Sequence, residues 1–482
     1  MWVRLPENGY DKDSILKELE EVTKEDLNPL TGRMFGHSYE TGDNILRELS
    51  MKVYEAFMHK TMLDFTVYPS LVKLENEIVS MVLSIMHGEE NSTGSFTYGG
   101  TESIMLATKA AREYFRKRKG EGVIPELILP MTGHPSFVKA AEYLNMKVKF
   151  APVDYKTLKI DVDKVNELIN DRTAMIVGSA PNYPFGTVDD IAALSDIAVD
   201  KKVWLHTDSC IGGFVLPFFK MLGEKIPDFD FKLPGVYSIS ADLHKYGYAP
   251  KGASVVLYRS KELKLGQIFV GTRWPGYPLV NTAVLSTRSA GSLAASWAIL
   301  KYLGVKGYKD MASRILSAKR KTILGLKEMR FQILGEPESS LVAFTSDEVN
   351  LSKLSSIIGK KGWYIQVQPG SDYLKFPSSI HLTLSPVHDE LAKDFLADLK
   401  EALEEAKKME ESDQLKANIL RMIRDMEPNK IIEELPRLLE YVGVSSEKVP
   451  KDLELVDELI KSLAPDLVEA MLKHVINEIL SP

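Results

Sequence analysis

Hydrophobic residues recur along the chain in two alternating patterns, short apolar runs and longer stretches with helical spacing. The apolar runs predict strands at 126–130, 147–151, 174–178, 203–206, 238–241 and 253–258. Helical spacing predicts helices between several of them, and residues 103–119 form the clearest one, with apolar side chains on one side and basic ones on the other. Strands that alternate with helices indicate an α/β fold, a mostly parallel sheet with helices on both faces. In such sheets, ligands bind at the carboxyl ends of the strands.

The same patterns divide the chain into four segments. Residues 1–69 are predicted to form an N-terminal arm and a helix. Residues 70–304 are predicted to form the large domain that contains the sheet. Strand patterns at 341–345, 363–367 and 380–384, followed by a helical pattern at 389–408, predict a small α+β domain over 305–408. Residues 409–482 contain only helical patterns, broken at Pro428, Pro436 and Pro465, and predict a helical C-terminal extension.

Composition narrows the class of protein. The net charge of −7 gives the chain no electrostatic reason to bind nucleic acid or an anionic membrane surface. Cys210 is the single cysteine, so we expect neither an internal disulfide nor a cysteine-built zinc site, and we predict no metal. The N-terminal residues lack the apolar core of a signal peptide, and no apolar run approaches the roughly 20 residues that span a bilayer. The predicted location is therefore the cytoplasm.

The first candidate for chemistry is Lys245, in the segment Ser-Ile-Ser-Ala-Asp-Leu-His-Lys-Tyr-Gly over 238–247. A lysine that forms an imine must be neutral for part of the time, so it needs a partly desolvated site. Its position directly after a predicted strand, beside His244 and between glycines at 247 and 252, fits such a site. Taken alone, the segment more often indicates an exposed loop lysine.

Three further segments follow predicted strands of the same sheet. Asp208 ends an apolar strand, where a carboxylate can keep a pyridine nitrogen protonated, although an aspartate there can also cap a helix. Gly100 and Thr101 open the 103–119 helix, and free backbone N–H groups at a helix N-terminus bind anions such as phosphate. His134 also reaches this edge and could stack on a flat ring or simply occupy a turn. The predicted cofactor is pyridoxal phosphate, because these segments together supply a phosphate site, a stacking histidine, a pyridine-facing aspartate and an imine-forming lysine.

These segments resemble the fold-type I pyridoxal-phosphate enzymes of the group II decarboxylase superfamily, and within it the sphingosine-1-phosphate lyases. The resemblance covers about 30–400 and is carried by Ser240-Ala241-Asp242-Leu243-His244-Lys245-Tyr246-Gly247, Gly99-Gly100-Thr101-Glu102-Ser103-Ile104, Leu74-Glu75-Asn76-Glu77-Ile78-Val79 and Val177-Gly178-Ser179-Ala180-Pro181. It implies a seven-stranded sheet, an aminotransferase-like large domain and a homodimer with shared active sites.

The resemblance also implies roles for individual residues. Lys245 would carry the cofactor, Asp208 would pair with the pyridinium and His134 would stack on the ring, and these three are the predicted catalytic residues. The predicted cofactor-binding residues are Gly100, Thr101, His134, Asn182, Asp208, Ser240, His244, Lys245 and, from the neighbouring subunit, Thr287. The predicted substrate-binding residues are His206, Lys251, Arg288 and Asp64.

The chain departs from the lyases on the substrate side. Asp64 stands where the lyases have a histidine that helps to bind the substrate phosphate, and Phe35 stands where a tyrosine of their N-terminal arm is expected. A carboxylate at that position would repel a phosphate. Three alternatives therefore stay open: retro-aldol cleavage of a (phosphorylated) amino alcohol, decarboxylation of an amino acid, and a regulatory protein that keeps the fold without activity.

Overall fold

The computed structural model describes residues 3–408 and 453–480, and these divide into two compact units. The large unit comprises Phe35–Phe344 and His381–Lys393, and the small unit comprises Met1–Met34, Thr345–Ile380 and Asp394–Pro482. The predicted division at 69, 304 and 408 follows sequence patterns and stays a prediction. Its boundary at 304 coincides with Gly304, whose φ of 53° interrupts the long helix α10 (Gly291–Glu328).

The large unit is built on a seven-stranded sheet with the order β1-β7-β6-β5-β4-β2-β3. The strands are β1 (Thr93–Thr97), β2 (Glu126–Pro130), β3 (Lys147–Ala151), β4 (Thr173–Ser179), β5 (Trp204–Asp208), β6 (Val236–Ala241) and β7 (Ser254–Tyr258). The pairs from β3 to β6 are parallel, and β7 pairs antiparallel with both β6 and β1. The predicted mostly parallel, seven-stranded sheet is therefore confirmed, with β1 as a strand that the apolar runs did not predict.

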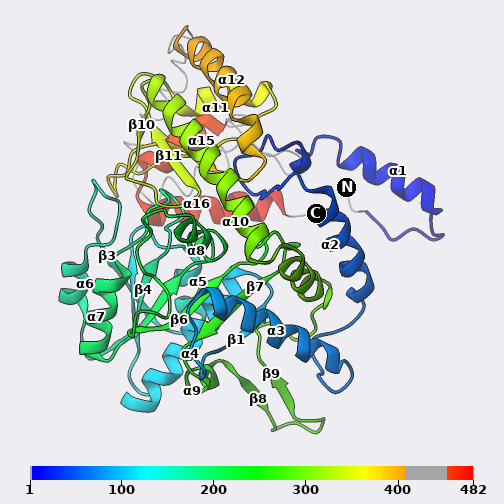
Figure 1. The fold of residues 1–482 in the computed structure, drawn as a ribbon, viewed down its shortest axis with the longest axis vertical. Coiled ribbons are helices and arrows are strands. Elements are labelled where there is room, and N and C mark those ends of the chain that lie inside the picture. Colours follow the sequence, from blue (N-terminus) through cyan, green and yellow to red (C-terminus); the bar gives the residue numbers. More distant parts are fainter. Residues whose placement is uncertain (1–2, 409–452, 481–482) are drawn as a thin grey trace. The chain divides into compact units, whose positions relative to one another are not determined.

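Helices connect these strands and pack against the sheet (Figure 1). They are α3 (Pro69–Ile85), α4 (Gly100–Lys119), α5 (Ser136–Tyr143), α6 (Val162–Leu168), α7 (Ile191–Lys201) and α8 (Leu216–Met221). The apolar side of α4, with Ile104, Leu106 and Ala107, is buried as its pattern predicts. Because α4 packs on β4, β6 and β7, its N-terminus lies where it can face the carboxyl ends of the central strands.

Further elements of the chain are not part of the seven-stranded sheet. Helix α2 (Asn44–Phe57) packs against α10, and a two-stranded hairpin, β8 (Phe269–Gly271) and β9 (Leu279–Asn281), follows a short helix, α9 (Lys261–Lys264). A second sheet has the order β10-β11-β13-β12, with β10 (Gln332–Ile333), β11 (Leu341–Thr345), β12 (Gln366–Gln368) and β13 (Ser379–Thr383). The strand predicted at 363–367 exists with shifted bounds, because β12 begins at Gln366. Trp363 and Ile365 are buried as core residues, whereas the ladder is made by the more polar residues that follow.

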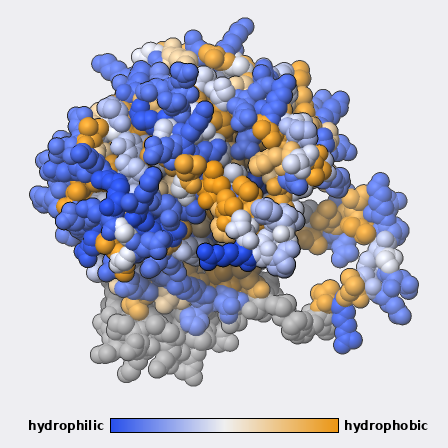
Figure 2. Space-filling view, turned by 90° about the horizontal axis from the view of Figure 1, so that it is seen from below, coloured by the Kyte–Doolittle hydropathy of each residue, from blue (hydrophilic) through white to orange (hydrophobic). Residues whose placement is uncertain are grey.

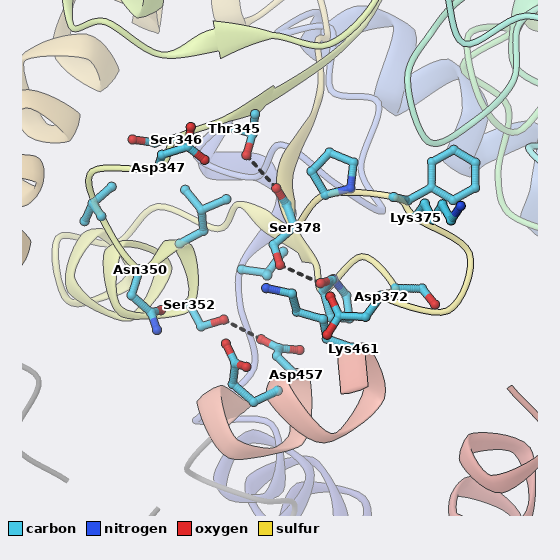
Figure 3. A pocket seen from close by; sticks show the side chains of 18 residues that line it. Thr345, Ser346, Asp347, Asn350, Ser352, Asp372, Lys375, Ser378, Asp457 and Lys461 are labelled. Atoms are coloured by element: carbon cyan, nitrogen blue, oxygen red, sulfur yellow. Dashed lines mark hydrogen bonds between the residues drawn. The ribbon is translucent and has the colours of Figure 1, made fainter. Parts of the chain in front are cut away.

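The small unit contains the helices α1 (Lys12–Val22), α11 (Leu351–Lys360), α15 (Leu453–Ser462) and α16 (Pro465–Ile479) and most of α12 (His388–Lys408). Pro465 begins α16, as expected of a helix breaker, whereas Pro428 and Pro436 lie outside the described residues. The described part of the extension packs on its own chain, because the Ser352 hydroxyl of α11 donates to the Asp457 carboxylate of α15 at 2.7 Å. Around this contact lies a cavity of about 530 Å³ with acidic, basic and hydroxyl side chains (Figure 3).

Candidate active site

The predicted catalytic residues follow adjacent strands of the large sheet at their carboxyl ends. Asp208 is the last residue of β5, and β6 ends at Ala241, four residues before Lys245. The two strands are parallel and pair Asp208 with Ser240, so both segments leave the sheet at the same edge. The cavity in the small unit contains none of the predicted site residues.

Lys245 lies in the turn after β6 and faces a buried carboxylate. Its Nζ atom is 3.0 Å from Oδ2 of Asp242, whose side chain is 1% exposed, and the lysine side chain itself is 19% exposed. Burial alone would lower the pKa of Lys245, but the groups around its nitrogen, above all the Asp242 carboxylate, together outweigh burial, and the pKa is raised. In the absence of a reaction partner, Lys245 is therefore held as an ammonium ion.

Asp208 is buried and oriented by two hydrogen bonds. Its Oδ1 atom accepts from the backbone N–H of Cys210 at 3.1 Å and from the Ser240 hydroxyl at 3.2 Å. Two residues earlier, His206 has no exposed surface, and its ring nitrogens lie 2.7 Å from the Ser238 hydroxyl and 3.2 Å from the Ser240 hydroxyl. Burial lowers the pKa of His206 to about 4. The neutral, fully enclosed ring of His206 orients the hydroxyl groups of Ser238 and Ser240. This placement does not support the substrate contact predicted for His206.

The N-terminus of α4 forms an anion site. Helix α4 begins at Gly100, where a Cβ atom would lie only 2.7 Å from Oδ2 of Asp242 and 3.0 Å from Sγ of Cys210. Only a glycine fits at this position. The exposed Thr101 has its hydroxyl 2.9 Å from that of Ser136, and the free N–H groups of this first turn suit a phosphate.

Two histidines border this site with fixed ring orientation. Nδ1 of His244 accepts from the backbone N–H of Ala253 at 3.2 Å, so its proton is on Nε2, which lies 3.7 Å from Oδ2 of Asp242. Nδ1 of His134 accepts from the backbone N–H of Ser136 at 3.2 Å. His134 is exposed by surface area, yet the atoms packed around its ring lower its pKa by burial. A ring that is accessible from one side and favours the neutral form suits stacking on a flat ligand.

Other predicted residues are placed differently. Asn182 is buried, and its side chain binds the Leu158 carbonyl, the Thr187 hydroxyl and the Phe185 N–H, so its atoms serve the turn after β4. Asp64 is exposed and accepts two hydrogen bonds from Thr66 through Oδ1, and these bonds lower its pKa. The cofactor contact of Asn182 and the substrate contact of Asp64 stay predictions.

Thr287, predicted to act in the neighbouring subunit, and Arg288, predicted to bind substrate, differ in exposure. Thr287 is exposed, whereas Arg288 is 5% exposed. Within the described part of the chain, Nε and Nη1 of Arg288 have no hydrogen-bond partner. Its positive charge lowers the pKa of Glu75, although burial of that carboxyl prevails and raises it. The substrate contact of Arg288 stays a prediction as well.

Three residues that pattern reasoning did not assign lie at this site. Asp242 is the partner of Lys245, and the N-terminal arm contributes His37 and Tyr39. Nζ of Lys251 donates to the His37 carbonyl at 3.0 Å and lies 4.9 Å from the centre of the Tyr39 ring. Burial raises the pKa of Tyr39 against the opposing charge of Lys245, and it lowers the pKa of Lys251. The arm carries no periodic signal, so only the folded chain reveals that it reaches the lysine loop.

This donor set fits pyridoxal phosphate. The first turn of α4 with Thr101, Ser240 and His244 would hold the phosphate, Asp208 the pyridine nitrogen, His134 the ring face and Lys245 the aldehyde carbon. When bound, the cofactor supplies a protonated ring that withdraws electrons from a bond next to the substrate amine. The fold and the site define a pyridoxal-phosphate-dependent lyase.

Comparison with known proteins gives the family. The model of the pyridoxal-dependent decarboxylase conserved domain matches residues 3–347. The chain is 37% identical over 408 residues to a sphingosine-1-phosphate lyase of Drosophila melanogaster, which covers 84% of this chain and 73% of that protein. It is 34% identical over 404 residues to an L-aspartate/L-glutamate decarboxylase of Pyrococcus horikoshii, which covers 83% of this chain and 100% of that protein.

Solved structures agree with this result. A sphingosine-1-phosphate lyase of Burkholderia pseudomallei superposes with a TM-score of 0.79 at 36% identity, over 84% of this chain and 94% of that one. The chain belongs to the pyridoxal-phosphate-dependent decarboxylase family, and its cofactor is pyridoxal phosphate. Among the described residues, no helix combines the length and the apolar composition that crossing a membrane requires.

Proposed function

We propose that this lyase breaks a carbon–carbon bond of an amino alcohol by retro-aldol cleavage, releasing an aldehyde and an amine, with a phosphorylated amino alcohol as the first substrate to test. The observation that carries the proposal is the placement of Tyr39 and Lys251 beside Lys245. The likeness to sphingosine-1-phosphate lyases from several organisms supports it.

The chemistry explains why these two side chains matter. A retro-aldol step removes the proton of the hydroxyl group as the carbon–carbon bond breaks, so the site needs a group that hydrogen-bonds this hydroxyl. Tyr39 is kept protonated because burial raises the pKa of its phenol, and its Oη atom can accept from the substrate hydroxyl while donating its own proton onward. Lys251 adds a positive charge on the same side for an anionic group of the substrate.

A product screen with the loaded enzyme tests the proposal. Phosphorylated amino alcohols are scored for aldehyde release by hydrazone formation, and amino acids are scored for CO2 release. Tyr39→Phe should lower aldehyde release by at least about tenfold with cofactor content unchanged, which corresponds to roughly 1.4 kcal/mol. The control is Tyr10→Phe, because Tyr10 is an exposed tyrosine of the same arm. Equal rates for wild type and Tyr39→Phe would remove the proposed role of the phenol.

Decarboxylation of an amino acid is the second candidate. Asp64 is exposed, and its hydrogen bonds with Thr66 lower its pKa, so a negative charge persists where the lyases have a histidine. At ~4 Å from a phosphate, each such charge pair costs about 1 kcal/mol in water. The full-length likeness to the Pyrococcus horikoshii enzyme also favours this candidate.

The variant Asp64→His separates the two candidates. If the chain is a retro-aldol lyase, this variant should improve turnover of a phosphorylated amino alcohol. Asp64→Asn is the matched control, because it keeps an oxygen acceptor for Thr66 while it removes the charge. No gain with Asp64→His, together with CO2 release from an amino acid by the wild type, would establish the decarboxylase.

We further infer a homodimer with shared active sites. A hairpin patch of exposed apolar side chains surrounds β8 and β9 and consists of Phe269, Val270, Trp274, Tyr277 and Val280. Figure 2 views the side on which Figure 1 draws this hairpin and shows hydrophobic residues gathered on that face. Exposed apolar patches of this kind favour protein contacts, and a two-fold dimer is the commonest closed assembly. Thr287 follows the hairpin and is exposed, which suits a residue that acts in a neighbouring copy.

A cytoplasmic location remains part of the same proposal. Cell fractionation with the full chain tests it, and recovery in the membrane pellet after a high-salt wash would contradict it.

A further inference from the structure

A chain of fully buried hydroxyl groups runs beneath the lysine loop. The Oγ1 atom of Thr97 lies 2.6 Å from Oγ of Ser103, which in turn lies 2.8 Å from Oγ of Ser254. All three side chains have no exposed surface, and they come from β1, α4 and β7. The Oγ atom of Ser254 also donates to the Ala241 carbonyl at 3.2 Å, so the hydroxyl chain ends at the residue before Asp242.

Asp242 itself is placed between the anion site and the lysine. It is 2% exposed, its Oδ2 atom is 3.0 Å from Nζ of Lys245, and Nε2 of His244 is 3.7 Å away. Within the described residues, Oδ1 is buried without a hydrogen-bond partner, and it lies 2.8 Å from the position that a Cβ atom would take on Gly100. An unsatisfied oxygen on a buried carboxylate lowers the stability of the fold, and a functional role explains why such a cost is retained.

Asp242 is the only carboxylate among the groups that act on Lys245 in the described chain. Tyr39 and Cys210 also face this lysine, and burial raises the pKa of both, so they are neutral. Lys245 also interacts with Lys251, His244 and His134, which do not add negative charge.

We propose that Asp242 is a positioning residue that controls the protonation state of the Lys245 nitrogen. In the unlinked lysine, Asp242 holds Nζ as an ammonium ion at a fixed place beside the anion site. If the cofactor aldehyde were joined to Nζ with loss of water, the nitrogen would keep one proton, and the Asp242 carboxylate would stabilise that positive charge. This inference rests on the proposed linkage of the cofactor to Lys245 and adds a dedicated counter-ion to it.

The sign of the effect follows from the charges. Only a neutral amine attacks an aldehyde, so a counter-ion that favours the ammonium form slows linkage at neutral pH. The same charge favours the protonated form of the linked nitrogen, which is the more reactive form towards an incoming substrate amine. Replacing Asp242 with a neutral isostere should therefore lower the pH at which each form loses its proton.

The test compares Asp242→Asn with wild type in two measurements that do not require turnover. In the cofactor-free full chain, acetylation of Lys245 is followed against pH by peptide mass spectrometry. In the loaded enzyme, the visible absorption band is titrated against pH. Both midpoints should fall by at least about one pH unit, equivalent to about tenfold more labelling of Lys245 below the midpoint. Asp230→Asn is the matched control, because Asp230 is a similarly buried aspartate that pairs with His87 at 2.8 Å.

Unchanged midpoints in Asp242→Asn would overturn the proposal, since a purely structural aspartate alters stability without moving a titration. A wild-type measurement remains decisive if that variant does not fold: Lys251, whose pKa burial lowers, should be acetylated at lower pH than Lys245. Acetylation of Lys245 at the pH of Lys251 or below would also overturn it. Borohydride trapping at Lys245 is scored separately, so a failure of the linkage itself is distinguishable from a failure of the counter-ion.

Discussion

Replacing Gly100 with alanine should weaken binding of the cofactor phosphate. The added Cβ atom would lie 2.7 Å and 2.8 Å from the two Asp242 oxygens and 3.0 Å from Sγ of Cys210. Real Cβ contacts essentially never fall below 3.0 Å, so the first turn of α4 or the Asp242 side chain must move. Asp242 is held by its ion pair with Lys245, which leaves the helix turn as the part that shifts.

The magnitude follows from the cost of overpacking a buried site. Such insertions cost about 1–3 kcal/mol, which corresponds to roughly a 5- to 140-fold loss of affinity if the strain falls on the phosphate contacts. The assay titrates the full chain with pyridoxamine phosphate, which has no aldehyde and cannot link to Lys245. Pyridoxamine without phosphate serves as the companion ligand, and its weaker binding should change little, because only the phosphate uses the helix N-terminus.

Gly122→Ala is the matched control, because nothing lies within 4 Å of a Cβ atom at that position. Urea unfolding of both variants separates a general loss of stability from a local change at the anion site. An affinity of Gly100→Ala for pyridoxamine phosphate within about twofold of wild type would refute the reasoning, since the close approach to Asp242 would then carry no cost.

Four further predictions address the other site residues. Lys245→Ala should abolish borohydride-trapped cofactor, and a labelled peptide that contains another lysine would contradict the assignment. Asp208→Ala should retain cofactor but lose at least about 3 kcal/mol of transition-state stabilisation in kcat/KM, and a rate near that of wild type would reduce Asp208 to a turn cap. Burial lowers the pKa of His206 to about 4 against about 6.5 in the unfolded chain, so its stabilising contribution is present above pH 6.5 and is lost as the pH falls towards 4. Between pH 7.5 and 5, wild type should therefore lose about 2 kcal/mol more in urea unfolding than His206→Asn, and equal losses would contradict the buried neutral state. Mixing Lys245→Ala chains with Thr287→Ala chains should restore part of the activity, and a fully active monomer in light scattering would exclude a shared site.

The main chemistry could be predicted from the sequence because it sits in short segments at strand ends. Lys245, Asp208 and His134 each follow an apolar run, and parallel strands bring such ends to one edge, whereas the Gly100 turn is recognised because it opens a clearly periodic helix. That argument needs the order of elements and not their packing. It therefore survives errors of a few residues in the strand boundaries.

Other features depend on tertiary contacts that periodicity does not encode. Strand β1, Thr-Gly-Ser-Phe-Thr, has no apolar run, yet four of its five residues are buried because it pairs with β7 and packs beside α3 and α4. Tyr39 lies in an arm without periodic signal, and its approach to Lys245 appears only when the arm folds back. For His206, the tertiary contacts remove a predicted role. Its strand position suits a ligand contact, but both of its ring nitrogens face serine hydroxyls of the neighbouring strand.

The two buried aspartates of the site lie on neighbouring strand ends and suit opposite ends of one flat cofactor. Asp208 pairs with Ser240 across the β5–β6 ladder, and Asp242 follows Ser240 by two residues, just past the end of β6. Each carboxylate can keep a proton on a nitrogen, Asp208 on that of the ring and Asp242 on that of Lys245. An electron-withdrawing ring needs the first proton throughout the reaction, whereas the second must be lost and regained whenever Lys245 is released or linked again. This difference matches their surroundings, because Asp208 is fixed by a backbone N–H and a serine hydroxyl, while Asp242 has one oxygen on Lys245 and, within the described chain, the other without a hydrogen bond.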